Sequence, residues 1–206
     1  MLGQGRVNPP EEHMSIPQEP KPAKLFVSVI SSFVERINAT LSELAAHYGV
    51  LDFVSPLLPF NYTDYYSTEM GKVLLRRFVS FNRLIRQEDL ASIKVQTNAL
   101  EHEQTEEGNR LVNIDPGYLV AERLVLASGK NYGHRIYLGK GIYADLTLIY
   151  RDKDYQPLAW TYPDYAEPQV RGWLKAIREK YILQLRREEQ TTVATENPKG
   201  NFGVVE

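Results

Sequence analysis

The sequence contains no cysteine among its 206 residues. This absence excludes disulfides, thiolate nucleophiles and zinc or iron–sulfur sites built on cysteine, and it leaves the redox compartment open. No apolar run approaches the roughly 18 to 20 residues of a membrane-spanning helix, and the N-terminal stretch has no apolar core typical of a signal peptide. We therefore expect a soluble, cytoplasmic protein with no membrane partner.

An excess of charge of one sign is also missing. The 24 basic and 26 acidic residues nearly cancel, so bulk charge gives no reason to expect a general nucleic-acid binder. The GxxxxGK[ST] phosphate loop, a GxGxxG fingerprint after a strand and the GxSxG nucleophile elbow are all absent. These absences disfavour P-loop, Rossmann and serine-hydrolase functions.

Histidine is scarce as well, with four in the chain. His102 opens the stretch HEQTE, in which Glu106 stands where a zincin motif needs its second histidine. We therefore predict no metal site, and the sequence indicates no particular cofactor.

The composition divides the chain into a core and two tails. Residues 1–23 combine prolines with polar residues, and residues 188–206 are polar without helical periodicity. Both compositions favour disorder over packed structure. We predict a single domain over 24–187, because this length and a 43% hydrophobic composition suffice for one ordinary core.

Periodicity within the core predicts strands that alternate with helices. Apolar and β-branched runs predict strands at 24–31, 50–55, 73–85 and 110–114. Helical spacing predicts helices at 33–48 and 87–108. The turn-forming sequence Asp115-Pro116-Gly117 is expected to close the fourth strand. The order strand, helix, strand, strand, helix, strand is that of the ferredoxin-like βαββαβ unit.

The C-terminal part predicts an extension of that unit. Strands are expected near 134–138, 142–150 and 155–160, followed by an amphipathic helix over 167–187. The predicted fold class is therefore α+β, with a mainly antiparallel sheet and a ferredoxin-like core extended by a C-terminal β-hairpin and helix.

The second predicted helix carries a polar row beside its apolar stripe. Lys94, Asn98 and Glu101 fall on successive turns and border that stripe. Such a row could line a pocket, and the alternative is a solvated row of ion pairs. We predict Lys94 and Glu101 as catalytic candidates, the first as an electrostatic stabiliser and the second as a base. Asp115 is the other candidate base, although a turn role would also explain it.

Two basic stretches without acids suggest a surface that attracts anions. The first, between Met70 and Glu88, includes Arg77, and the second, between Arg123 and Asp145, includes Lys130, His134 and Arg135. The arginine fork suits phosphate or carboxylate. The alternative is that these cations only keep the edge of a sheet soluble.

The second basic stretch runs into a predicted hairpin. A three-residue loop at 139–141 would place Leu138 opposite Ile142, Ile136 opposite Ala144 and His134 opposite Leu146 on an apolar face. The other face would pair Tyr137 with Tyr143 and Arg135 with Asp145. The predicted ligand-binding residues are therefore Arg77, Asn98, Lys130, His134, Arg135, Tyr137 and Asp145. Arg135 is expected to be a structural partner of Asp145 first, and His134 a neutral, hydrogen-bonded histidine.

Several long stretches resemble a known family. FVSPLLPFNYTDYYSTEMG, RRFVSFNRLI, IKVQTNALE, VNIDPGYL, LVLASGKNYGHRIYLGKGIYADLTLIY and WTYPDY follow one another in the order of the bacterial domain-of-unknown-function family 4416. The resemblance covers roughly residues 24–165 and implies a single intact domain. The family brings no established activity. Some of its members carry the name GTP-binding protein, which the missing phosphate loop does not support.

The sequence leaves three functions open. The first is binding of a small anionic ligand, phosphorylated, nucleotide-like or carboxylated, on a basic sheet surface, with or without catalysis. The second is an RNA-binding module, and the third is a protein-interaction module that uses its proline-rich arm. The oligomeric state is not indicated.

Overall fold

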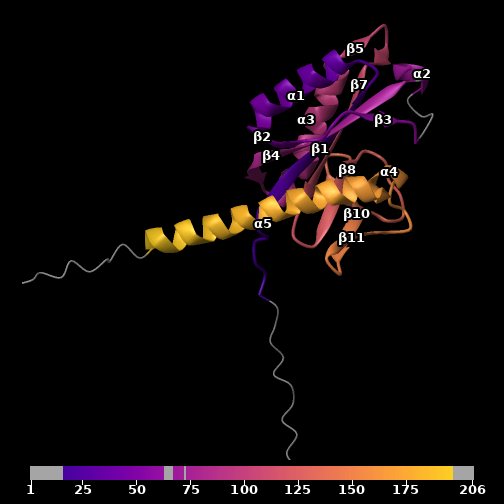
Figure 1. Cartoon of the computed structure of the whole chain (residues 1–206). Coiled ribbons are helices and arrows are strands. Elements are labelled where there is room, and N and C mark those ends of the chain that lie inside the picture. The colour runs from indigo at the N-terminus through magenta and orange to yellow at the C-terminus, as the bar shows by residue number, and fades with distance from the viewer. Residues whose placement is uncertain (1–15, 63–66, 72, 197–206) are drawn as a thin grey trace, which may run out of the picture.

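A computed structural model of the chain describes residues 16–62, 67–71 and 73–196 (Figure 1). Its helices and strands are β1 (Ala23–Ser31), α1 (Val34–Tyr48), β2 (Leu51–Val54), β3 (Leu58–Phe60), α2 (Ser67–Met70), β4 (Leu74–Ile85), α3 (Leu90–Glu103), β5 (Thr105–Glu106), β6 (Asn109–Arg110), β7 (Val112–Leu119), β8 (Arg123–Ser128), β9 (Arg135–Gly139), β10 (Ile142–Arg151), β11 (Asp154–Pro157), α4 (Pro163–Ala166) and α5 (Pro168–Glu196). The α+β class is confirmed.

The main sheet is antiparallel, as predicted. Its strands follow the order β11-β10-β8-β7-β1-β4-β2, with β3 also paired to β4 and β9 also paired to β10. The central strand β1 has the sequence AKLFVSVIS, and all nine of its residues are buried. Such an apolar, β-branched run suits a strand that is covered on both faces.

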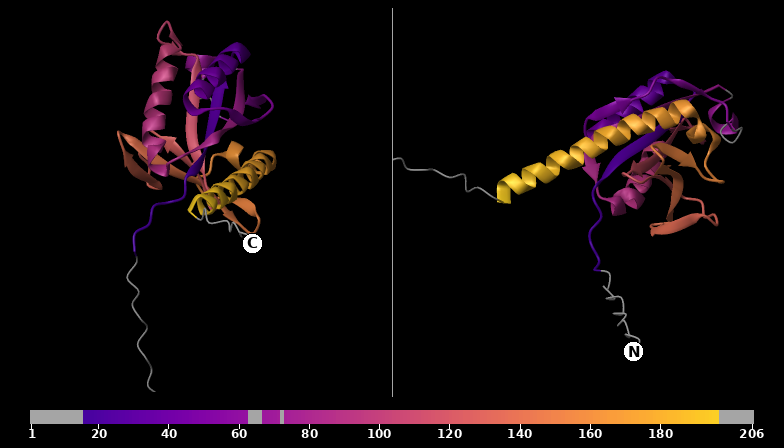
Figure 2. Two further views of the ribbon diagram at one scale, coloured as in Figure 1. Left: turned by 90° about the vertical axis from the view of Figure 1, so that its left-hand side faces the viewer. Right: turned by 60° about the horizontal axis from the view of Figure 1, so that its bottom comes forward.

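Helices cover the two faces of the sheet. On one face, the Tyr48 ring of α1 packs against Phe81, and its hydroxyl donates to Gln96 Oε1 of α3 at 2.8 Å. On the other face, Trp173 of α5 packs against Phe78. Figures 1 and 2 show α5 running across the sheet and projecting beyond it. No helix in the described part of the chain is long and apolar enough to cross a membrane.

The helix boundaries depart from the predictions at two places. The second predicted helix, 87–108, is shorter, because a 3₁₀ turn precedes Leu90 and the small β5–β6 hairpin follows Glu103. The final helix continues past the predicted end at 187 to Glu196. Residues 16–22 have no regular structure, whereas 1–15 and 197–206 of the predicted tails lie outside the described residues.

The predicted turn at Asp115-Pro116-Gly117 is wrong, because these residues lie inside β7. Proline is tolerated within a strand where neighbouring pairing is absent. Within the described residues, β8 pairs with β7 only over Gly117–Leu119. A Cβ at Gly117 would lie 2.5 Å from the Val125 carbonyl oxygen, so glycine allows the two strands to meet there. The strands part before Gly117, which leaves the preceding edge of β7 open.

The predicted hairpin is correct in its strands and wrong at its tip. Tyr137 pairs with Tyr143, Ile136 with Ala144 and Arg135 with Asp145, as predicted. Ile142, however, pairs with Gly139 rather than Leu138, and a register shift follows. The loop is therefore the two residues Lys140 and Gly141, with φ of 55° and 75°. His134 precedes β9 and does not pair with Leu146.

Candidate functional site

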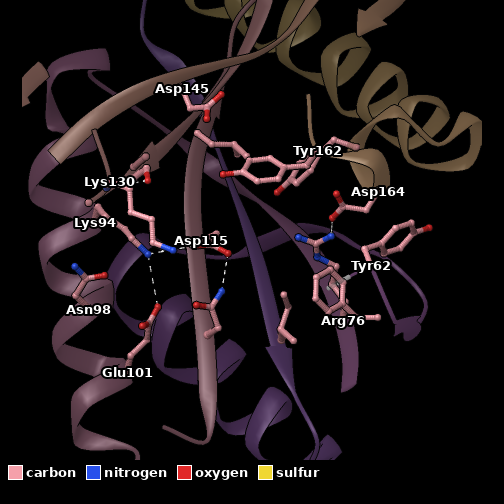
Figure 3. Close-up of a pocket in the computed structure, with 18 of the residues that line it drawn as sticks. Tyr62, Arg76, Lys94, Asn98, Glu101, Asp115, Lys130, Asp145, Tyr162 and Asp164 are labelled. Atoms are coloured by element: carbon pink, nitrogen blue, oxygen red, sulfur yellow. Dashed lines mark hydrogen bonds and ion pairs between the residues drawn. The ribbon is translucent and has the colours of Figure 1, made fainter. Parts of the chain in front are cut away.

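A cavity of about 590 Å³ lies where β7 and β8 part (Figure 3). It is also bounded by α3, by β3 and by the segment that enters α4. Its lining residues are Ile30, Phe60, Tyr62, Arg76, Lys94, Asn98, Glu101, Arg110, Asn113, Asp115, Leu126, Ala127, Ser128, Gly129, Lys130, Asp145, Tyr162, Pro163, Asp164 and Tyr165. The volume falls within the usual range of small-molecule sites.

The α3 side of the cavity is built on the open edge of β7. The Ile114 N–H donates to Glu101 Oε1 at 2.7 Å, and Lys94 Nζ donates to the Ile114 carbonyl oxygen at 2.7 Å. These two side chains satisfy the buried N–H and C=O of Ile114, which β8 does not reach. Asn98 lies between them on the same helix face and is exposed. The predicted polar row of α3 therefore borders a cavity.

A charged network joins this row to β7 and β6. Lys94 Nζ lies 3.3 Å from Asp115 Oδ1 and 3.6 Å from Glu101 Oε1. Arg110 lies 3.0 Å from Glu101 Oε2, and Asn113 donates to Asp115 Oδ2 at 2.6 Å. Burial raises the pKa of Glu101 above its ordinary value, against the opposing effect of Lys94. The Asp115 side chain is 30% exposed and that of Glu101 8%, so Asp115 is the more accessible carboxylate.

The opposite side of the cavity is aromatic and carries one neutralised ion pair. The Arg76 guanidinium pairs with Asp164 and lies 4.7 Å from the ring centroid of Phe60 and 5.2 Å from that of Tyr165. Tyr62 packs on Phe60 with the ring centroids 5.8 Å apart. Figure 3 shows Arg76, Asp164 and Tyr62 across the cavity from the α3 row.

One arginine organises the mouth of the cavity. Arg135 Nε donates to Asp145 Oδ2 at 2.8 Å, as the predicted pairing required. Its two other nitrogens donate to Ser128 Oγ at 2.8 Å, to the Lys130 carbonyl oxygen at 2.9 Å and to the Tyr162 hydroxyl at 2.7 Å. The side chain of Arg135 is only 5% exposed. Its guanidinium thus holds the loop at 128–130 and the Tyr162 ring in place.

The structure brings together six of the ten predicted site residues. Lys94, Asn98, Glu101, Asp115, Lys130 and Asp145 line the cavity. Arg77, His134, Arg135 and Tyr137 do not line it.

The four predicted residues outside the lining have other surroundings. Arg77 lies on the opposite face of β4 from Arg76. The His134 ring stacks on Trp160 with centroids 4.9 Å apart, and its Nε2 lies 3.4 Å from Asp145 Oδ2. Tyr137 contacts Tyr143 and is 60% exposed.

Sequence reasoning missed most of the other polar and aromatic residues of the lining. Among them are Arg76, Arg110, Asn113, Ser128, Phe60, Tyr62, Tyr162 and Tyr165. Strand alternation already separated Arg76 from Arg77, and the apolar run around Phe78 could have marked Arg76 as the inward-facing one. No local pattern predicts the pairing of Arg76 with Asp164, because the two residues lie in distant segments of the chain.

The charged side chains that line the cavity form several ion pairs. No cluster of three or more metal-ligating side chains occurs within residues 16–62, 67–71 and 73–196. The arrangement can hold an acidic group through its ammonium and amide donors. It can also move a proton at Asp115 or Glu101.

Comparison with known proteins places the chain in a family. Neither the curated proteins nor the solved structures contain a match. The model of the family described as Domain of unknown function (DUF4416) matches residues 21–181, which is most of the chain. The cavity lies entirely within this range. The chain therefore belongs to the family of the domain of unknown function 4416.

Proposed function

We propose that the cavity binds a small anionic ligand that carries a phosphate or a carboxylate. The observation that supports this most is the convergence of Lys94, Asn98 and Lys130 on one side of a cavity of about 590 Å³. Ammonium and amide groups are donors that an acidic group requires. The cavity therefore has both the space and the donors for such a ligand.

Two lysines on this side can face an anion. Lys94 and Lys130 line the cavity, whereas Arg110 is held between Glu101 and Glu69, at 3.0 and 3.1 Å. The carboxylates of Glu101 and Asp115 oppose the two lysines. Burial raises the pKa of Glu101, so part of that negative charge is suppressed as the pH falls toward the glutamate range. The Arg76–Asp164 and Arg135–Asp145 pairs are each neutral in sum.

The proposed binding site is this cavity and not the basic sheet surface that the sequence suggested. The arginines of the first basic stretch do not gather on one face: Arg83 donates to the His47 carbonyl oxygen and Arg86 pairs with Glu88. Arg76 lines the cavity. The proposed ligand therefore enters the gap between β7 and β8, where it meets Lys94 and Lys130.

Substitution at the mouth tests this proposal. Lys130 and Asn98 are exposed lining residues, so Lys130→Ala and Asn98→Ala should leave the fold intact. Isothermal titration with inorganic phosphate, sugar phosphates and dicarboxylates should show at least a tenfold loss of affinity in each variant, about 1.4 kcal/mol. Arg186→Ala, which removes a charge from an exposed position of α5, is the matched control. Unchanged affinity in both lining variants, or no binding of any anion, contradicts the proposal.

Acid–base catalysis is part of the same proposal. Asp115 is the proposed base, because it is the more exposed carboxylate and accepts from Asn113. Lys94 is the proposed electrostatic stabiliser, and its ammonium group also lies beside the Glu101 carboxylate.

RNA binding is a second candidate that one observation favours. The rings of Tyr132 and His134 stack with their centroids 6.1 Å apart, and the His134 ring stacks in turn on that of Trp160. The angle between the ring planes is 14° in each pair. Tyr132 and Trp160 are 56% and 40% exposed, so bases could extend this stack. Affinity for single-stranded RNA that falls steeply with salt would support this function.

We also propose that β1, α1, β2, β4, α3 and β7 form the ferredoxin-like βαββαβ unit predicted from sequence. The strand order β7-β1-β4-β2 and the placement of α1 and α3 on one face support this correspondence.

A further inference from the structure

We propose that the ligand joins its acidic group to a planar ring, and that the ring lies against Tyr162 while the acid lies at Lys94 and Lys130. The ligand class is an aryl or nucleoside-type acid. This inference rests on the proposed function and adds a second recognition element to it. The two sides of the cavity differ in chemistry, and a ligand that spans the cavity must match both.

Among the residues that the structure describes, the aromatic side offers no unpaired charge to a ligand. Arg76 pairs with Asp164, donates from Nε to Ser28 Oγ at 2.8 Å and packs over the rings of Phe60, Phe78 and Tyr165. An acidic group would gain little there and would lose its hydration. A flat, weakly polar group fits this side, because ring faces stack favourably on one another.

Two rings on this side are open to a ligand, those of Tyr62 and Tyr162, which line the cavity and are 43% and 42% exposed. We assign the ligand ring to Tyr162 because its side chain has a fixed position. Its hydroxyl is held by Arg135 at 2.7 Å, and its ring lies 6.3 Å from that of Tyr165. Pro163 follows it at the start of α4 and restricts the backbone. The ring is therefore fixed before binding, which lowers the entropic cost of stacking on it.

The same guanidinium couples the two halves of the site. Arg135 binds the Tyr162 hydroxyl and also the carbonyl oxygen of Lys130. The proposed ring platform and the proposed acid-binding loop are thus held by one side chain. Figure 3 shows Tyr162 and Lys130 on either side of the Asp115 strand, at the same end of the cavity.

Paired probes separate the ring from the acid. Isothermal titration should compare AMP with ribose 5-phosphate, and phenyl phosphate with inorganic phosphate. Stacking of one base on an aromatic side chain corresponds to about a five- to hundredfold gain in affinity. We expect the ring-bearing member of at least one pair to bind more tightly by such a factor.

Two substitutions locate the ring. Tyr162→Leu should abolish the preference for the ring-bearing probe while leaving affinity for ribose 5-phosphate or phosphate unchanged. Tyr162→Phe keeps the ring and loses only the hydroxyl bond to Arg135, so it should retain the preference. Tyr137→Leu removes an exposed tyrosine outside the cavity and should change neither affinity.

The outcomes distinguish this inference from the proposed function. If no probe binds, the proposed function fails. If ring-free probes bind as tightly as their ring-bearing partners, the anion site stands and the ring inference is overturned. A ring preference that survives Tyr162→Leu also overturns the inference, because the ring then lies elsewhere.

Discussion

Two buried lysines, one on strand β1 and one on helix α3, have similar partners and different surroundings. Lys24 of β1 pairs with Asp52 and donates to Gln184 Oε1 of α5 at 2.5 Å. Lys94 of α3 donates to a backbone carbonyl and lies beside Glu101 and Asp115. Lys24 is wholly buried between the sheet and α5, whereas Lys94 borders the cavity.

The closed cluster around Lys24 serves the fold. Asp52 also accepts from Ser80 Oγ at 2.6 Å, and Gln184 donates to the Asn82 carbonyl oxygen at 2.7 Å. Burial lowers the pKa of Lys24, against the effect of Asp52. These contacts tie α5 to three strands.

The open cluster has the same kinds of groups but keeps a carboxylate accessible. Asp115 is 30% exposed, whereas Asp52 of the closed cluster is 17% exposed. A buried charged pair is therefore a candidate functional site only where it borders space that a ligand can enter. Substitutions in the two clusters should differ accordingly.

The largest effect is expected at the closed cluster. Lys24→Met removes the partner of Asp52 at a position that little water can reach, so the free energy of unfolding should fall by about 3–5 kcal/mol. Urea denaturation followed by circular dichroism measures this loss. The double variant with Asp52→Leu should recover part of it, because no uncompensated charge then remains. A loss below about 1 kcal/mol, typical of an exposed ion pair, would contradict a closed cluster.

The same change at the open cluster should cost less. Lys94→Met leaves the Ile114 carbonyl oxygen, Glu101 and Asp115 without their ammonium donor, but cavity water can solvate them. We expect a loss of about 1.5–3 kcal/mol, the usual range for a hydrogen bond to a charged group. The same denaturation experiment compares the two variants directly. Equal losses at Lys24 and Lys94 would show that the cavity does not relieve the network.

Local patterns were enough to predict most of the fold. The buried run of β1 and the helical spacing at 33–48 both placed their elements to within a residue or so. The Asp-Pro-Gly stretch gave a wrong prediction, because its residues favour turns. Their place inside a strand is explained only by the neighbouring strand β8, which diverges from β7 at this point. Tertiary pairing overrode the local signal at that point.

The site was predictable where it follows one element and not where it joins several. Lys94, Asn98 and Glu101 share a face of α3, so helical geometry alone brought them together. The Arg76–Asp164 pair joins β4 to α4 over a long separation in sequence, and helix or strand periodicity cannot predict such a contact. The hairpin pattern did predict the Arg135–Asp145 pair, because strand register links those two residues.

The smallest expected effect concerns the pH dependence of stability at Glu101. Burial raises the pKa of this carboxyl in the folded state, so the folded protein binds its proton more readily than the unfolded chain does. The resulting stability is fully present below the ordinary glutamate pKa, about 4.3. It is lost as the pH rises through the raised folded-state value, at no more than about 1.4 kcal/mol per pH unit.

Glu101→Gln removes this titration while keeping an oxygen that can accept from the Ile114 N–H. Denaturation of the variant across a pH series should therefore lack the decline that the natural chain shows above the ordinary glutamate pKa. Glu179→Gln, an exposed position of α5, should keep that decline. If the stability curves of the natural chain and Glu101→Gln run parallel, Glu101 titrates alike in both states, and the network around Lys94 then compensates fully for burial.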